Sequence, residues 1–180
     1  MKKATITKLT SIMMAILFVS TISCAQGDKS QRPSPPAKAE GMAAGANITI
    51  DYSSPAVKDR KIWGELVPYD KFWRAGANEA TTFTTDKDIK VGGKPLPKGT
   101  YTMFMKPGES EWTVVLNSET GQWGIKRGGV ANFDPANNVV EVSVKPEKAA
   151  KFTERLAYEV TDNGFALIWE NMKVPVSISK

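Results

Sequence analysis

Residues 155–169 read RLAYEVTDNGFALIW, and this stretch decides the fold class. Apolar residues alternate with polar ones over 156–160, the pattern of a strand that buries one face. The triplet DNG at 162–164 is a turn signal. Beyond it the alternation resumes over 165–169, with aromatic and branched side chains on one face. The stretch therefore predicts two antiparallel strands joined by a tight turn.

The same pattern recurs on both sides of this hairpin. Two short stretches resemble helices instead, at 69–73 and 146–150, each of about a turn or two. Taken together, the hairpin and the further strand candidates predict an all-β fold. We expect a single antiparallel β-sandwich of jelly-roll or immunoglobulin-like type, with about eight or nine short strands. The further strand candidates are 47–53, 80–85, 88–91, 101–105, 112–116, 140–145 and 174–179.

The N-terminal segment 1–24 predicts export. It opens with three lysines, followed by an apolar stretch without charge from residue 9 to about residue 22. That stretch is shorter than the ~20 apolar residues that a membrane span needs. It is also rich in serine and threonine, so a secretory signal is the preferred interpretation.

Two processing sites fit the end of this signal. Residues 23–25 match the small-x-small rule of ordinary signal peptidase, whereas residues 21–24 resemble a bacterial lipobox in which Cys24 becomes the lipidated first residue. Lipidation is preferred, and its acyl chains would supply the hydrophobic signals that stable anchoring needs. We expect a protein of the cell envelope, in the periplasm or on the outer membrane, which contacts the membrane only through Cys24.

Charge and residue usage exclude several classes of function. The net charge is +5, and removal of the three signal lysines lowers it to +2, so there is no electrostatic case for nucleic acid. The chain has no histidine, which excludes Ser-His-Asp triads and His-ligated metals. Its one cysteine, Cys24, leaves no thiolate nucleophile, disulfide or sulfur-bound metal beyond the signal. No cofactor and no metal site are expected.

Motifs spread along the chain point to a family. They are DYSSP at 51–55, KDRKIWG at 58–64, LVPY at 66–69, WRAGANEAT at 73–81, GKPLPKGTY at 93–101, EWT at 111–113 and QWG at 122–124. Together they resemble the family catalogued as domain of unknown function 2911, which occurs mainly in exported proteins and lipoproteins of bacteria. The resemblance implies an all-β domain. It implies no activity, because none is established for the family.

The resemblance changes the interpretation of residues 25–46. Composition alone, with prolines, small residues and no aromatic residue, indicates a linker. Family members look alike from about 32–36 onward, so these residues are expected to form an ordered lead-in strand. The predicted organisation is a signal peptide at 1–24, a short tether at 25–31 and a β-sandwich domain at 32–180.

One connection, from residue 118 to 138, is long and rich in glycine and asparagine. Loops of this length in compact domains are usually functional or disordered. The chain also departs from the family here, because IKRGG at 125–129 replaces the usual tyrosines. Further departures are Asp70, where glycine is common, and Ala75, where threonine is common. If this loop touches a ligand, the ligand preference differs from that of related chains.

The stretch FWRAGANEATTF at 72–83 is the best site candidate. As a ligand site, Trp73 would offer a stacking face and Arg74 a bidentate fork for a carboxylate or phosphate. Asn78 and Glu79 would add hydrogen bonds to a polar ligand.

The same stretch also fits a structural brace, which is the preferred interpretation. In that case Arg74 would pair with Glu79 or Asp51, and Trp73 would pack in the core. Asn78 would take the left-handed position of a turn.

Two other features are weaker candidates. Arg60 and Lys61, in a cluster of cations, would attract an anionic sugar, lipid headgroup or phosphate, although a solvated loop is preferred. Trp123, in the long loop, would serve either as a sugar-stacking platform or as the hydrophobic plug of that loop. Trp112 and Trp169 lie on predicted strands and are assigned to the core.

The preferred function is an exported, non-catalytic binding or accessory module for a polar or anionic small molecule or a glycan. One alternative is a hydrolase that uses two carboxylates, with Glu65 and Glu79 among the available acids. The other is a structural protein of the envelope whose only partners are proteins. Missing histidine and cysteine lower the case for an enzyme.

Overall fold

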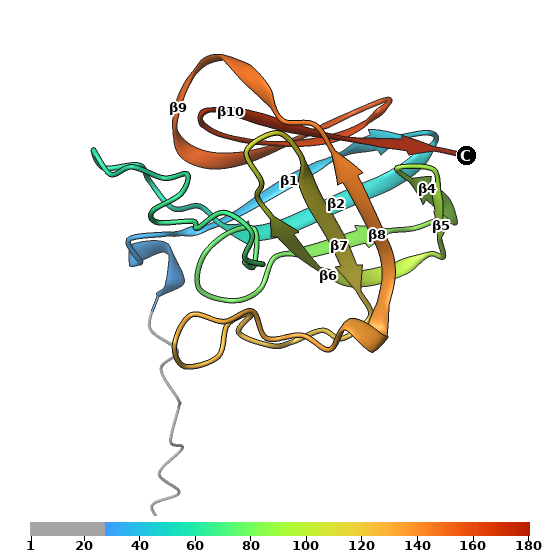
Figure 1. Ribbon diagram of the computed structural model, residues 1–180. Coiled ribbons are helices and arrows are strands. Elements are labelled where there is room, and N and C mark those ends of the chain that lie inside the picture. The colour runs from blue at the N-terminus through green and yellow to red at the C-terminus, as the bar shows by residue number, and fades with distance from the viewer. Residues whose placement is uncertain (1–27) are drawn as a thin grey trace, which may run out of the picture.

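Two antiparallel sheets face each other in the computed structural model, which describes residues 28–180 (Figure 1). The predicted signal, its lipidation site Cys24 and tether residues 25–27 lie outside this range. The larger sheet has the order β1 (Pro36–Ala43), β2 (Ala46–Ser53), β3 (Thr82–Thr85), β6 (Gly99–Lys106), β7 (Trp112–Asn117) and β8 (Asn138–Val144). The smaller has the order β5 (Lys94–Leu96), β4 (Ile89–Val91), β10 (Gly164–Ser179) and β9 (Glu147–Thr161). Two 3-10 helices complete the description, η1 (Lys29–Gln31) and η2 (Pro135–Asn137).

The all-β sandwich predicted from the sequence is confirmed, and so is the hairpin predicted over residues 155–169. β9 and β10 pair antiparallel across the predicted turn, with Val160 opposite Phe165 and Tyr158 opposite Leu167. The stretches 165–169 and 174–179, predicted as separate strands, are one strand. Its register shifts on both sides of Glu170, which has a left-handed φ of 56°, so the strand bends without ending.

Both predicted helices are wrong. Residues 147–150 belong to β9, where Glu147 and Lys148 pair with the far part of β10, so sheet pairing overrides their helical preference. In 69–73, Asp70 has a left-handed φ of 58°, and Trp73 forms an isolated antiparallel bridge with Met105. Within residues 28–180, no helix has the length and apolar character needed to cross a membrane.

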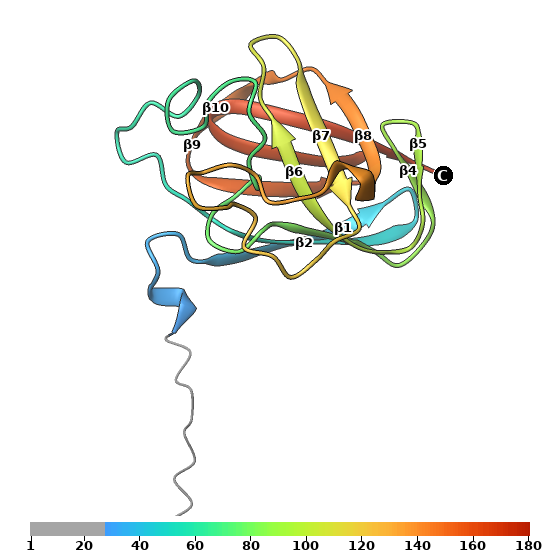
Figure 2. The ribbon, with the colours of Figure 1, turned by 60° about the horizontal axis from the view of Figure 1, so that its bottom comes forward.

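The segment that composition assigns to a linker contains a strand. β1 starts at Pro36, the last residue of the expected lead-in strand, and pairs with β2 along its whole length. Residues 32–35 are not part of a strand. The first described residues and the connection 54–81 lie at the end of the sandwich opposite the C-terminus (Figures 1 and 2).

Four tryptophans form a cluster at this end of the core. Trp63 is its centre, with ring centroids 4.9 Å from Trp112, 5.7 Å from Trp169 and 6.3 Å from Trp73, each in edge-to-face geometry. Trp112 and Trp169 are buried, as predicted, and Trp73 packs against the core. None of the four indole N–H groups has a hydrogen-bond partner in the described structure. The cluster is therefore held by apolar burial and ring-on-ring packing. Two of its members, Trp73 and Trp169, also line the candidate site.

Candidate functional site

Two long connections meet above the tryptophan cluster. The N–H of Ala80, in the connection after β2, donates to the carbonyl of Gln122, in the connection after β7, at 3.3 Å. Gly124 approaches so closely that a Cβ there would lie 2.8 Å from the Cβ of Arg74 and 2.9 Å from that of Ala80. Its φ of +88° also favours glycine. These contacts fix where Arg74 projects.

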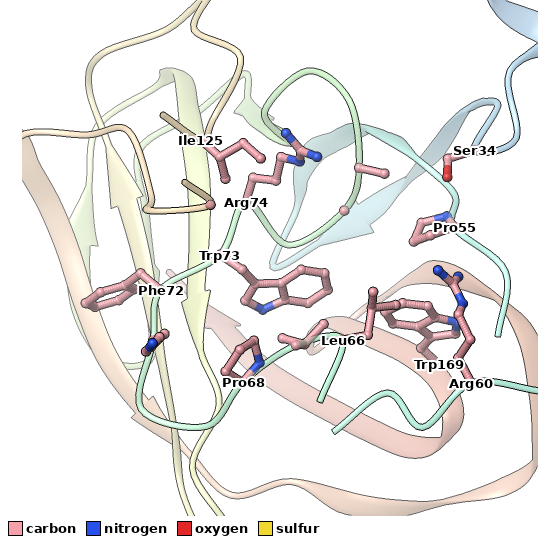
Figure 3. Close-up of a pocket in the computed structure, with 15 residues that line it drawn as sticks. Ser34, Pro55, Arg60, Leu66, Pro68, Phe72, Trp73, Arg74, Ile125 and Trp169 are labelled. Carbon is pink, nitrogen blue, oxygen red and sulfur yellow. The ribbon is translucent and has the colours of Figure 1, made fainter. Parts of the chain in front are cut away.

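A pocket of about 340 Å³ opens between the two connections (Figure 3). This volume lies within the roughly 300–1,000 Å³ typical of small-molecule sites. The indoles of Trp73 and Trp169 and the side chain of Leu66 supply much of its apolar lining, and Trp73 lies near the middle of the view. Among the described residues that line it, three are cations, Arg60, Lys71 and Arg74, and none is a carboxylate.

Arg74 lines the pocket beside Trp123. Its Nη1 donates to the carbonyl of Trp123 at 3.3 Å, and its guanidinium lies 5.7 Å from the centre of the Trp123 ring. Within residues 28–180 no carboxylate lies in ion-pair distance of it, so the brace with Glu79 or Asp51 is not formed. Burial lowers the pKa of Arg74, and the more distant charge of Glu79 opposes that shift. The result is a partly desolvated cation that faces a cavity.

Arg60 enters the same pocket from another side, beside Trp169 (Figure 3). Its Nε donates to the carbonyl of Val57 at 3.0 Å and its Nη2 to the carbonyl of Ala56. These bonds fix the guanidinium but leave N–H groups for another acceptor. Lys61 behaves differently: it pairs with Glu65 at 3.2 Å, both side chains are exposed, and neither residue lines the pocket.

Glu79 and Asn78 brace the pocket wall. The Glu79 carboxylate pairs with Lys29 at 3.0 Å and with Arg32 at 2.8 Å. Asn78 donates from Nδ2 to the carbonyl of Ser34 at 2.8 Å and has the expected left-handed φ, 56°. Ser34 itself lines the pocket. The stretch 72–83 thus has two roles. Its first residues line the pocket, and Asn78 and Glu79 bind the N-terminal segment.

The carboxyl of Glu79 is strongly perturbed. Burial raises its pKa, but hydrogen bonds from its own backbone N–H, from Lys29 and from Arg32, with the charge of Arg32, outweigh burial and hold the pKa at about 2 instead of 4.5. A carboxyl whose pKa is depressed on folding stabilises the fold above the unfolded pKa. That contribution is lost as the pH falls from about 4.5 toward 2.

Glu79→Gln is therefore expected to lower the free energy of unfolding at pH 7 by roughly 1 kcal/mol. The side chain is 42% exposed, so solvent screening keeps the effect well below the full pKa shift. Urea denaturation from pH 7 to pH 2.5 should show the deficit shrinking as the pH falls. Glu109→Gln, at an exposed residue with no ion pair in the described structure, is the control. A deficit that stays constant with pH would refute the ionic role.

The remaining candidates take other positions. Trp123 is 49% exposed and supports Arg74 through its carbonyl and ring, but it does not line the pocket itself. Glu65 and Glu79, the acids named for a hydrolase, both lie in ion pairs outside the pocket. Residues 28–180 contain no cluster of three acidic residues placed to hold a metal.

Sequence reasoning missed part of the pocket. Trp169 was assigned to the core alone, although one side of it also contributes to the pocket. Leu66 and Lys71 were not singled out. Leu66, 44% exposed, falls in the LVPY motif, which was the available signal. Lys71 directly precedes the candidate stretch and has no motif of its own.

Comparison with known proteins places the chain in a family without giving it an activity. The family model described as "Protein of unknown function (DUF2911)" matches residues 34–178. No curated protein matches the chain, and no solved structure does. The pocket must therefore be interpreted from its own chemistry.

Proposed function

The chain belongs to the DUF2911 family, whose description assigns no activity, and we propose from the pocket itself that the domain is a non-catalytic module that binds a small anionic molecule. The observation that carries this proposal is the charge of the pocket. Three cations and no carboxylate line it among the described residues, and its two guanidinium groups lack an ionic partner in residues 28–180.

An anion bound at either guanidinium group would supply the ionic partner that this group lacks among residues 28–180. A planar guanidinium binds a carboxylate or phosphate through paired hydrogen bonds, which are stronger than those between neutral groups. Arg74 is already partly desolvated, so it has less hydration to lose when a ligand covers it than a fully exposed arginine would have. Arg60 is held by two backbone carbonyls, so little side-chain freedom is lost when it binds.

The apolar lining restricts the ligand further. Trp73 and Trp169 stack with centroids 6.1 Å apart, and Leu66 lies beside them in Figure 3. A fully solvated inorganic ion would leave these surfaces uncovered. We propose an organic anion, bound in the cell envelope after export by the signal at 1–24. Nucleic acid remains outside the proposal, because the chain lacks the charge for it.

Two arginine substitutions test the proposal. Butanoate and butyl phosphate are expected to bind the full-length protein, and butanol is not. Arg74→Gln and Arg60→Gln should each weaken binding of both anions about tenfold or more, since a hydrogen bond to a charged group contributes about 1.5–3 kcal/mol. NMR titration gives the dissociation constants.

The matched control is Arg127→Gln. It removes the same charge from the neighbouring loop, but Arg127 does not line the pocket. Binding should be almost unchanged in this variant. Equal weakening in all three variants would mean that net charge alone attracts the anion, and the site would be rejected. Turnover of a butyl phosphate ester bond would instead favour the hydrolase.

A further inference from the structure

A second hollow continues from the arginine pocket. Its volume is about 480 Å³, and it shares three lining residues with the first: Lys71, Phe72 and Gly129. Beyond this shared wall its lining changes character. Val130, Phe133 and their neighbours are apolar or glycine, and Lys71 is the one charged residue that lines it within the described structure.

The apolar wall of this hollow is fixed from behind. Phe133 stacks on the fully buried Phe104 at 4.5 Å and meets the edge of Phe72 at 5.2 Å. The Nζ of Lys106 lies 5.3 Å from the centre of the Phe72 ring. These contacts hold both phenylalanines in place without a ligand.

Another part of the border exposes apolar surface. Val130 is 65% exposed, the largest exposed fraction among the large exposed apolar residues of the described chain. Gly128 and Gly129 have φ of 96° and 83°, and apart from their chain neighbours no residue of the described structure has a heavy atom within 4 Å of the position that a Cβ would take at either one. The hollow is therefore bordered by backbone and by Val130, with room for a chain to lie along it.

We propose that the ligand is an anionic amphiphile, with its head group on Arg74 and Arg60 and its apolar chain extending past Phe72 along Val130 and Phe133. This inference rests on the proposed function. Charge complementarity sets the orientation, because both guanidinium groups line the first pocket and neither lines the second. An apolar chain in the second hollow covers surface that otherwise faces water.

A homologous series of ligands tests this inference. Butanoate, hexanoate, octanoate and decanoate are titrated into the full-length protein below their micellar concentrations, with decanol as the uncharged comparison. The dissociation constant should fall roughly two- to fourfold for each added methylene, as expected for partial to full burial of a CH₂ group. Decanol should bind far more weakly than decanoate.

Two valine variants locate the chain. Val130→Asn should flatten the dependence on chain length and leave butanoate binding unchanged. Val139→Asn is the control, since Val139 is 38% exposed on β8 and lines neither hollow, and it should keep the full dependence. Arg74→Gln should weaken every carboxylate by a similar factor.

The outcomes separate the two proposals. If butanoate binds in an Arg74-dependent way but longer chains bind no better, the anion site stands and the amphiphile is rejected. Two results reject the amphiphile in this orientation. One is a decanol affinity equal to that of decanoate. The other is a dependence of the dissociation constant on chain length that Val130→Asn does not change. If no carboxylate binds at any length, both proposals fail.

Discussion

Replacing Trp63 by alanine is expected to lower the free energy of unfolding by about 3–5 kcal/mol. Trp63 is 8% exposed and packs edge to face against three other tryptophans, so its loss opens a cavity in the middle of the cluster. It does not line the arginine pocket, so the effect falls on the fold that supports the pocket. Equilibrium denaturation in urea measures it.

Trp123→Ala is the matched control. The same side chain is removed, but from a residue that is 49% exposed and lies in the long loop. We expect a loss below about 1 kcal/mol, as for most exposed positions. If the two variants lost the same stability, the cluster around Trp63 would not be the structural centre of this end of the sandwich.

Gly124→Ala is expected to lower the free energy of unfolding by about 2–5 kcal/mol. The left-handed backbone at φ +88° costs a residue with a Cβ about 1–2 kcal/mol. The added methyl would also overlap the Cβ atoms of Arg74 and Ala80, and overpacking of this kind costs typically 1–3 kcal/mol. Because relief of the overlap would displace Arg74, binding of butanoate should weaken as well. Urea denaturation and NMR titration of the same sample give both numbers.

Gly121→Ala separates backbone strain from crowding. Gly121 lies in the same loop with a similar φ, +85°, and apart from its chain neighbours no residue among 28–180 has a heavy atom within 4 Å of its Cβ position. The Gly121→Ala variant should show only the backbone-strain part of the loss in unfolding free energy, about 1–2 kcal/mol, and its butanoate affinity should stay unchanged. Equal losses in the two glycine variants would mean that the loop does not pack against Arg74 as described.

Local patterns were enough to predict the fold class. The alternation over 155–169 gives the β9–β10 hairpin because both strands bury one face and the turn residues lie between them. The local pattern predicted the wrong element where pairing with residues distant in sequence determines the structure. Residues 146–150 favour a helix locally, yet Glu147 and Lys148 pair with β10, and the bend at Glu170 hides the continuity of that strand.

The pocket could be predicted only in part. The stretch 72–83 and the loop after residue 118 were both singled out, and both line or border the pocket. The partners of each side chain depend on the tertiary fold, which local patterns do not specify. Glu79 pairs with Lys29 and Arg32, far away in sequence, and not with Arg74. Local patterns therefore do not predict that, among residues 28–180, no carboxylate pairs with Arg74.

In the proposed function, Arg74 serves a ligand and not the fold. The most direct test of this role is an NMR titration of wild type and Arg74→Gln with butanoate, with unfolding in urea measured on the same preparations without ligand. We expect about tenfold or more weaker binding, with the free energy of unfolding changed by less than about 1 kcal/mol. Unchanged binding together with a loss of about 3 kcal/mol or more would contradict it, because such a loss marks a buried structural partner.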